Sequence, residues 1–445
     1  MTTDTRRARI PAWFDQWGNI VPLLAAEFIV WLGFGGLIPV LPLYFVEQGL
    51  DLATLGLVIA AWPIARLVTE PIFGWLADRT ARVPWMVGGL LLTGVFELLP
   101  LFLVGPLAFV LLRGAAGIAA AMYDPAARGY LTDATPPERR GEAFGLYGAA
   151  QMGGLLIGPA IGAFGAGMFG GIQFVFVFSA IASFLGAAAV AWRVKETGGR
   201  THLAPAHDAA EFRRDTPSVT GRAASDADAD RTPNVDPTAP RRLLNRGLIA
   251  ALVINVGGYY AGGTYEVIWS LFLEDLGAGL DLIGFTFAMF GLPVLLLSPF
   301  AGRIVDRRGS YLFIVVGCVV PTIVGILYTL IVDPLWAVPL IIAEATAFAL
   351  LNPALYAVVA ANSPAGRSST AQGIFGAAGT MGFIVASLLT GVLAEEEIIY
   401  PFYVFSGVML ICLVLGLLIG GRRLRYHPPA TVATPTVEAA EVAAT

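Results

Sequence analysis

The chain is 445 residues long, and 57% of its residues are hydrophobic whereas only 13% are charged, with a formal net charge of −5. Because a soluble domain averages about 25% charged residues, this composition excludes an ordinary soluble protein and indicates a polytopic membrane protein. The two cysteines lie inside apolar runs and the three histidines in polar segments, so we expect no disulfide framework, metal site or nucleophilic triad. We also expect no cofactor and no nucleic-acid partner.

Apolar stretches long enough to span a bilayer, about 20 residues each, recur along the whole chain. We predict an all-α membrane protein with twelve transmembrane helices in two pseudo-symmetric six-helix bundles. The first six helices are expected at 21–46, 53–77, 83–104, 106–128, 141–166 and 172–192. The second six are expected at 247–273, 281–304, 311–331, 335–358, 369–393 and 401–420.

The two bundles, 21–192 and 247–420, are separated by a polar segment, 193–246, that is rich in Thr, Ala, Pro, Asp and Arg. Such a composition cannot bury a core, so we expect a flexible cytoplasmic linker. Two further cytoplasmic segments are expected at 1–20 and 421–445.

The basic residues are distributed asymmetrically along the chain. If the N-terminus is inside, the inner segments hold many bases, and the outer loops hold acids but no base. The inner bases are Arg6, Arg7, Arg9, Arg79, Arg82, Arg139, Arg140, Arg193, Lys195, Arg307, Arg308, Arg367, Arg422, Arg423 and Arg425. The positive-inside rule then predicts a multi-pass protein of the cell inner (plasma) membrane with both termini in the cytoplasm. The net charge of −5 is low for a protein with so many inner arginines, and only one of its 27 basic residues is lysine. Either a GC-rich genome with acidic linkers or a halophilic prokaryotic host would explain this.

A short motif, Gly-x-x-x-Asp-Arg, occurs twice, each time after a long apolar run. The copies run from Gly74 to Arg79 and from Gly302 to Arg307, 228 positions later. Pro125 and Pro353 lie in similar surroundings at the same offset. A spacing kept across separate landmarks indicates a duplicated unit, and duplicated membrane units often place a binding site between their two halves.

Twelve helices with this motif in both halves resemble the major facilitator superfamily along the whole chain. In that family the motif is a gate that holds the outward-facing state. The resemblance assigns the gate to Gly74, Asp78, Arg79, Arg82, Gly302, Asp306 and Arg307. The first copy departs from the family pattern at Ala81, where a glycine usually precedes the last base. The alternative for the arginines is that they set topology alone.

The predicted helix 141–166 contains a glycine-rich element that resembles the family's antiporter signature. Its members are Gly154, Gly158, Pro159 and Gly162, with Ala163 in place of the last glycine. A glycine face with a proline bend allows helices to pack closely. The element belongs to one half only, because Ala386 and Ser387 stand 228 positions after its Gly-Pro pair. Ordinary glycine-mediated packing is the alternative.

Two charged residues suggest proton coupling. Arg113 lies far inside an apolar run, where a charge is costly and needs a partner. The family has an arginine here that is tied to proton coupling, although a purely structural arginine is the alternative. Glu27 stands twelve residues before Pro39, as in some multidrug antiporters of the family, where this glutamate binds protons and cationic substrates. Their second acid, eight residues later, is Gly35 here. We expect Glu27 and Arg113 to form the functional pair.

Acids outnumber bases in the predicted helices. The embedded glutamates are Glu27, Glu70, Glu97, Glu266 and Glu344. Only Arg66 and Arg113 are embedded with them, so not every carboxyl can be ionised and paired. Arg66 and Glu70 are four residues apart, and we expect them to form a structural pair.

Several polar or aromatic side chains that share helix faces are candidates to line a substrate cavity. They are Trp31, Tyr147, Gln151, Tyr259, Glu266, Asn352 and Tyr356. Trp31 follows Glu27 by one turn and has the aromatic face that a cationic substrate prefers. The alternatives are interhelical hydrogen bonding for the polar residues and plain packing for Trp31.

These features predict a secondary active transporter and not an enzyme or an ATP-driven pump. We expect a monomer that exports a small hydrophobic or cationic compound, such as a drug, in exchange for protons as its bundles rock in the lipid bilayer. A transporter of a sugar or organic acid with the same fold is an alternative. A sensor that binds its ligand without moving it is an alternative of a different class.

Overall fold

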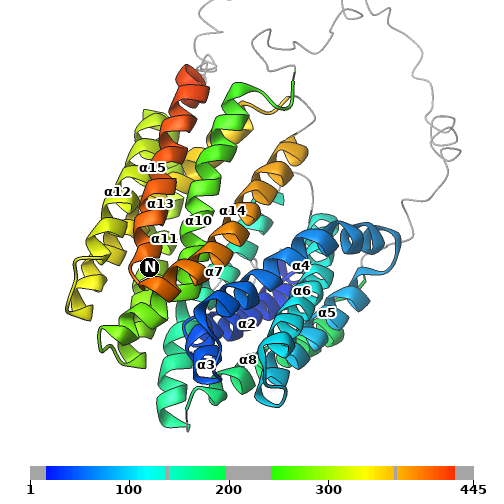
Figure 1. Ribbon diagram of the computed structural model, residues 1–445. Helices are drawn as coiled ribbons and strands as arrows, with labels where there is room; N and C mark the ends of the chain where they lie inside the picture. Colours follow the sequence, from blue (N-terminus) through cyan, green and yellow to red (C-terminus); the bar gives the residue numbers. More distant parts are fainter. Residues whose placement is uncertain (1–16, 136–139, 170, 197–241, 365–367, 426–445) are drawn as a thin grey trace, which may run out of the picture.

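The structure is a computed structural model that describes residues 17–135, 140–169, 171–196, 242–364 and 368–425. Its helices form two bundles, coloured blue to cyan and green to red in Figure 1. The N-terminal bundle consists of α2 (Val21–Leu37), α3 (Leu41–Glu47), α4 (Leu52–Arg79), α5 (Arg82–Leu98), α6 (Pro106–Ala134), α7 (Arg140–Met168) and α8 (Gln173–Arg193). The C-terminal bundle consists of α10 (Arg246–Asp275), α11 (Leu280–Arg308), α12 (Tyr311–Tyr328), α13 (Ala337–Ala361), α14 (Ser368–Glu396) and α15 (Tyr400–Gly420). Short 3-10 turns occupy Leu99–Leu101, Pro334–Trp336 and Gly421–Leu424.

The predicted number of transmembrane helices is confirmed, with one change. Within the described residues, 11 helices are long and apolar enough to span a membrane, and the bent pair α2 and α3 makes a twelfth. The pair bends by 42° around Pro39. Pro39 and Pro42 lack the N–H that would continue the helical hydrogen bonds, so a break here follows from the sequence.

Helix packing repeats between the halves. In the first half α2 packs against α7 and α8, and α4 packs against α6. The equivalent helices in the second half repeat these contacts, α10 with α14 and α15, and α11 with α13. The offset seen in the sequence is therefore a repeated three-dimensional unit.

The two halves are joined mainly at one end of the molecule, where α4 begins and α14 ends. We call this end the loop end. Here α4 meets α14, and α7 meets α11. The contact between α4 and α14 is close enough that a Cβ on Gly56 would collide with the carbonyl oxygen of Ser387. Nearby, the Ala53 N–H at the start of α4 donates to the Glu395 carboxylate at 3.3 Å.

At the opposite end, α8 ends and α10 begins, and we call this end the linker end. Here each half has its own hydrophobic core. One core contains Met86 and Tyr123 from the first half, and another contains Ile314 and Leu355 from the second half. A third core lies toward the loop end and contains residues of both halves. The two halves therefore share a core at the loop end and are separate at the linker end.

Candidate functional site

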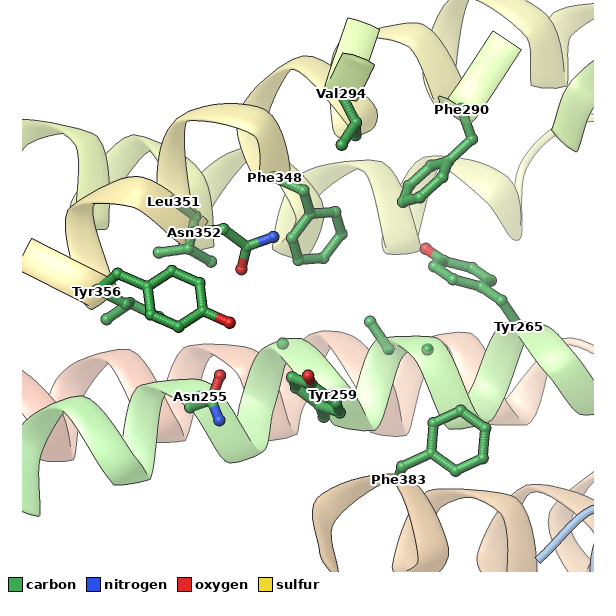
Figure 2. A pocket seen from close by; sticks show the side chains of 14 residues that line it. Asn255, Tyr259, Tyr265, Phe290, Val294, Phe348, Leu351, Asn352, Tyr356 and Phe383 are labelled. Atoms are coloured by element: carbon green, nitrogen blue, oxygen red, sulfur yellow. The ribbon is translucent and has the colours of Figure 1, made fainter. Parts of the chain in front are cut away.

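A cavity of about 350 Å³ lies in the C-terminal bundle, and α10, α11, α13 and α14 supply its walls. Of the predicted cavity residues, Tyr259, Asn352 and Tyr356 line it. Asn255 lines it as well, one turn before Tyr259 on α10. In Figure 2 these four side chains project from two facing helices, which explains why residues four apart in sequence reach one space.

The remainder of the cavity wall is mostly apolar and aromatic. Phe290, Phe348, Phe383 and Tyr265 are among its lining residues, and none of the lining side chains is charged. Apolar walls with a few neutral polar groups are typical of sites for small hydrophobic molecules. The cavity thus combines aromatic walls with amides and phenols that can form hydrogen bonds.

A salt bridge links the two halves. Arg113 of α6 lies 3.2 Å from Glu266 of α10, measured from Nη2 to Oε1. The side chains are only 11% and 18% exposed, so the attraction between them is weakly screened by water. The structure therefore places Glu266 beside Arg113 and not on the cavity wall.

Arg113 also has a carboxyl neighbour in its own half. Glu97 of α5 is close enough to interact with Arg113 electrostatically. Glu97 accepts a hydrogen bond of 3.0 Å from the Ser183 hydroxyl of α8. Arg113 thus interacts with one carboxyl of its own half and with one of the other half.

Glu27 and Arg113, which we expected to form the functional pair, have different partners in the structure and do not contact each other. Glu27 is fully buried and lies six residues from the start of α2 at the linker end, whereas Arg113 lies seven residues from the start of α6 at the loop end. Tyr123 of α6 contacts Glu27, and Arg113 lies ten residues before Tyr123 on the same helix. At 1.5 Å per residue, the two side chains are therefore about 15 Å apart in depth.

Neutral donors surround Glu27 instead. Trp31 and Gln151 donate to its Oε1 at 2.9 and 2.6 Å. The Tyr123 hydroxyl donates to its Oε2, and Tyr147 lies beside the carboxyl. Trp31, Tyr147 and Gln151, which we expected in the substrate cavity, therefore gather around Glu27 in the N-terminal bundle.

Comparison with known proteins identifies the architecture. Residues 23–266 and 252–442 match the family model of the Major Facilitator Superfamily. The chain belongs to this superfamily. The chain is 26% identical to Multidrug resistance protein 2 of Bacillus subtilis over 409 residues. This match covers 89% of the chain and 94% of that protein. The chain is also 35% identical to the Quinolone resistance protein NorA of Staphylococcus aureus over 136 residues, which cover 30% of the chain and 34% of NorA.

A solved structure has the same fold as this chain. A bacterial homolog of the human lysosomal transporter Spinster superposes with a TM-score of 0.72 at 14% identity, covering 92% of this chain and 98% of the other. This likeness supports the fold alone. It confirms the expected fold. The relatives above confirm the resemblance to the family's multidrug resistance group.

The contacts that the structure describes for the first gate motif lie within its own half. Asp78 lies 3.3 Å from Arg82, and Arg82 lies 3.0 Å from Asp133. Arg79 stacks on Trp75 at 3.9 Å from the ring centre. Helix α5 begins just after this motif. Glu196 caps its start by accepting a hydrogen bond of 2.8 Å from the backbone N–H of Arg82. The side chains of the second copy, Gly302, Asp306 and Arg307, lie outside the described residues.

The glycine-rich element of α7 packs against α2. A Cβ on Gly154 would lie 2.5 Å from the Phe28 carbonyl oxygen, and one on Gly158 would lie 2.5 Å from that of Leu32. Gly162 makes an equally close contact with Gly36, at 2.8 Å. Close packing, the alternative to a special antiporter role, is therefore what the structure shows for these three glycines.

Pro159 marks the side of α7 that faces the other half. A Cβ on Gly284 of α11 would lie 3.1 Å from the Pro159 carbonyl oxygen and 2.7 Å from the Ala163 side chain. The glycine-rich element thus lies between α2 of its own bundle and α11 of the other bundle. Its link to antiport stays a prediction.

The expected structural pair of Arg66 and Glu70 is present at 3.1 Å. It belongs to a larger network, because Arg66 also pairs with Asp124 of α6. Arg128, on the same helix, joins Glu70 at 3.4 Å. Sequence spacing could indicate the first pair but not the partners on α6.

Sequence reasoning also missed a cluster around Glu344. Tyr265 and Tyr328 both donate to this carboxyl, from α10 and α12. The three residues are far apart in sequence, and no motif connects them. The one available signal was Glu344 itself, an acid in an apolar run without a base nearby in sequence.

Proposed function

We propose that the chain is a proton-coupled exporter of small hydrophobic or cationic compounds, such as drugs, that works by alternating access. The observation that carries this proposal is the salt bridge between Arg113 and Glu266, which links the two halves near an aromatic cavity. A bond of this kind must break whenever the halves separate at the loop end. The names of the relatives, Multidrug resistance protein 2 and Quinolone resistance protein NorA, support a drug as the substrate.

Proton coupling follows from the cost of a buried charge that has lost its partner. When the halves separate, Glu266 loses Arg113, and an unpaired buried carboxylate is strongly unfavourable. A proton that enters from the loop end removes this cost and leaves Glu266 neutral during the return. Arg113 can then be compensated by Glu97 in its own half. Release of the proton at the linker end restores the salt bridge.

The proposed orientation has the linker end in the cytoplasm. Arg82, Arg193 and Arg422 lie at helix ends on that side, whereas Asp51 and Glu395 lie at the loop end. This arrangement satisfies the positive-inside rule. The observed state, with the halves separate at the linker end, would accept substrate from the cytoplasm and from the inner leaflet.

Transport in proteoliposomes tests the proposal. With an imposed pH gradient, the wild-type protein should concentrate the aromatic cation ethidium on the acidic side. Glu266→Gln should still exchange ethidium when its concentration is equal on both sides of the membrane. It should no longer accumulate ethidium in response to the pH gradient. Glu274→Gln is the matched control, because Glu274 is exposed on the same helix at the loop end. If Glu266→Gln concentrates ethidium as well as the control does, the salt bridge is not the coupling device.

The proposed role of Glu27 in coupling is tested separately. Its three neutral donors can support either a charged or a protonated carboxyl once a phenol or amide reorients. If Glu27 carries a coupling proton, Glu27→Gln should reduce pH-driven ethidium transport more than exchange. Full pH-driven transport by Glu27→Gln would remove Glu27 from the mechanism and leave Glu266 as its centre.

A further inference from the structure

The linker end of the C-terminal bundle is held together by hydrogen bonds from side chains to backbone carbonyls. The Asn245 amide donates to the Asn362 carbonyl oxygen at 2.6 Å, and the Asn362 amide donates to that of Arg423 at 3.5 Å. The Ser310 hydroxyl donates to the Leu424 carbonyl oxygen at 2.5 Å. These bonds form a junction between the starts of α10 and α12 and the turn that follows α15, and Figure 1 shows the start of α10 and the end of α15 at the same end of the bundle.

Six arginines surround this junction. Each is exposed and lies within three residues along the chain of one of the bonded groups: Arg242, Arg246, Arg308, Arg422, Arg423 and Arg425. Arg422 and Arg423 take part in none of the ion pairs that the structure describes. The acids of this bundle whose side chains are described, among them Glu274 and Glu395, lie toward the loop end or inside the bundle. The junction therefore carries positive charge that no described acid compensates.

The equivalent junction of the N-terminal bundle contains an acid. Ala134 corresponds to Asn362 at the offset of 228, and its carbonyl oxygen accepts a hydrogen bond of 2.8 Å from the Asn19 amide. The residue that corresponds to Leu424 is Glu196, whose carboxylate caps the start of α5. The same junction can thus be built with compensating charge, so the fold does not require the excess of arginine in the C-terminal bundle.

An apolar surface of α15 leads to these arginines. Leu415 and Leu418 are exposed on one face of the helix, and Arg422 follows Leu418 by four residues. At the start of α12, which packs against α15, Arg425 stacks over the ring of Tyr311 at 4.9 Å. An exposed tyrosine at a helix end is typical of the boundary between hydrocarbon and water. The arginines therefore lie at the depth of lipid headgroups, beside a surface that an acyl chain can cover.

We propose that the junction binds the phosphate of an anionic phospholipid, such as phosphatidylglycerol, in the cytoplasmic leaflet. Guanidinium groups match phosphate oxygens in pairs, and basic clusters beside a membrane helix attract anionic headgroups. Arg422 and Arg423 approach the phosphate from the turn after α15, and Arg246 and Arg308 from α10 and α11. The positive-inside rule accounts for bases on this side of the membrane, but it does not require a lipid held at one place.

Native mass spectrometry of the purified full chain, with one phospholipid added at a time in detergent, tests this lipid site. The wild-type protein should bind phosphatidylglycerol more tightly than the zwitterionic phosphatidylcholine. Arg422→Gln/Arg423→Gln should weaken the binding of phosphatidylglycerol about tenfold and leave that of phosphatidylcholine unchanged. Arg193→Gln/Lys195→Gln is the matched control, because it removes the same charge from exposed positions at the same end of the N-terminal bundle. This control should bind phosphatidylglycerol like the wild-type protein.

A second variant keeps the test decisive if the first does not fold. Arg246→Gln/Arg308→Gln removes two arginines from other segments of the junction and should also weaken the binding of phosphatidylglycerol. Glycerophosphoglycerol, the water-soluble headgroup, should not displace the lipid at equal concentration, because it lacks the acyl chains that cover α15.

Three results would overturn the inference. They are weakening in the N-terminal control as large as in Arg422→Gln/Arg423→Gln, unchanged binding in either junction variant, and displacement of the lipid by glycerophosphoglycerol at equal concentration. Ethidium transport does not enter this measurement, so its outcome is independent of the proposed export.

Discussion

At the scale of single residues, the buried carboxyls differ in what compensates their charge. Glu266 has an arginine from the opposite half. Among the described residues, the donors to Glu27 and Glu344 are neutral, three for the first and two for the second. A carboxyl that is paired across the interface loses its partner whenever the halves separate. A carboxyl inside one bundle keeps its local hydrogen bonds during that movement. This difference is why we assign coupling to Glu266.

Gln151 should contribute to stability through Glu27. Gln151→Leu removes a 2.6 Å hydrogen bond to a fully buried carboxyl. Loss of a hydrogen bond to such a group should lower the free energy of unfolding by about 1–3 kcal/mol, measured as a lower thermal unfolding temperature in detergent.

A double-mutant cycle identifies the cause of that loss. In a Glu27→Leu background the acceptor is absent, so Gln151→Leu should then have little further effect. If Gln151→Leu lowers stability equally in both backgrounds, the loss arises from packing of the amide and not from its bond to Glu27.

At the scale of helices, glycine spacing determines how closely elements approach. Gly154, Gly158 and Gly162 recur every four residues on α7 and allow its backbone to touch that of α2. Other glycines of the same helix, such as Gly148, meet nothing within 4 Å among the described residues. Only the glycines on the contact face are therefore required for packing.

Gly158→Ala should destabilise the N-terminal bundle. The new Cβ would lie 2.5 Å from the Leu32 carbonyl oxygen, so α2 would have to move away from α7. Gly148→Ala, on the same helix, should leave stability unchanged or slightly higher because alanine favours the helix. Thermal unfolding of the two purified variants makes the comparison. Equal unfolding temperatures would show that α2 and α7 are not held by this contact.

Much of the helical architecture could be predicted, because each span is a run of apolar residues that the sequence shows directly. Two departures have local causes. The first span breaks near Pro39. Helix α6 continues to Ala134, beyond the expected end at 128, because its last turns extend past the apolar run into a more polar stretch that contains Thr132 and Asp133. The polar pair of α13, Asn352 and Tyr356, was predictable from its spacing of four residues, which places both members on one face. Asn255 of α10 was not among the expected cavity residues.

Contacts between helices were less predictable. The partner of Arg113 depends on the relative depth of α6 and α10 and on how the two halves meet, and Glu266 is 153 residues away in sequence. The contact of Tyr265 with Glu344 likewise joins residues 79 positions apart. Neither pair follows the offset of 228, so the repeat that revealed the fold gave no information about them.

At the scale of the whole molecule, the two halves are closed at the loop end and separate at the linker end. The closed end is held by backbone contacts between α4 and α14 and by Glu395 at the start of α4. Glu395 lies where the partial positive charge of a helix start favours an acid. Asp51 caps the same helix, and the N–H of Thr54 holds the pKa of Asp51 below its usual value.

Locking the loop end should stop transport. In the variant Ala53→Cys/Glu395→Cys, a short thiol-reactive cross-linker should join α4 to α14, because the two positions are in contact in the closed state. The cross-linked protein should lose ethidium transport in proteoliposomes while either single variant, treated alike, keeps it. The native Cys318 and Cys412 are buried and should react slowly. Full transport after complete cross-linking would show that the loop end need not open.

The central claim is that substrate and proton movements are coupled through Glu266, and proton movement measures this most directly. An outward gradient of ethidium, imposed on proteoliposomes that contain an internal pH indicator, should drive protons inward through the wild-type protein and through Glu274→Gln. Glu266→Gln should carry ethidium outward without any change in internal pH. An equal change of internal pH in Glu266→Gln and in Glu274→Gln would contradict the claim.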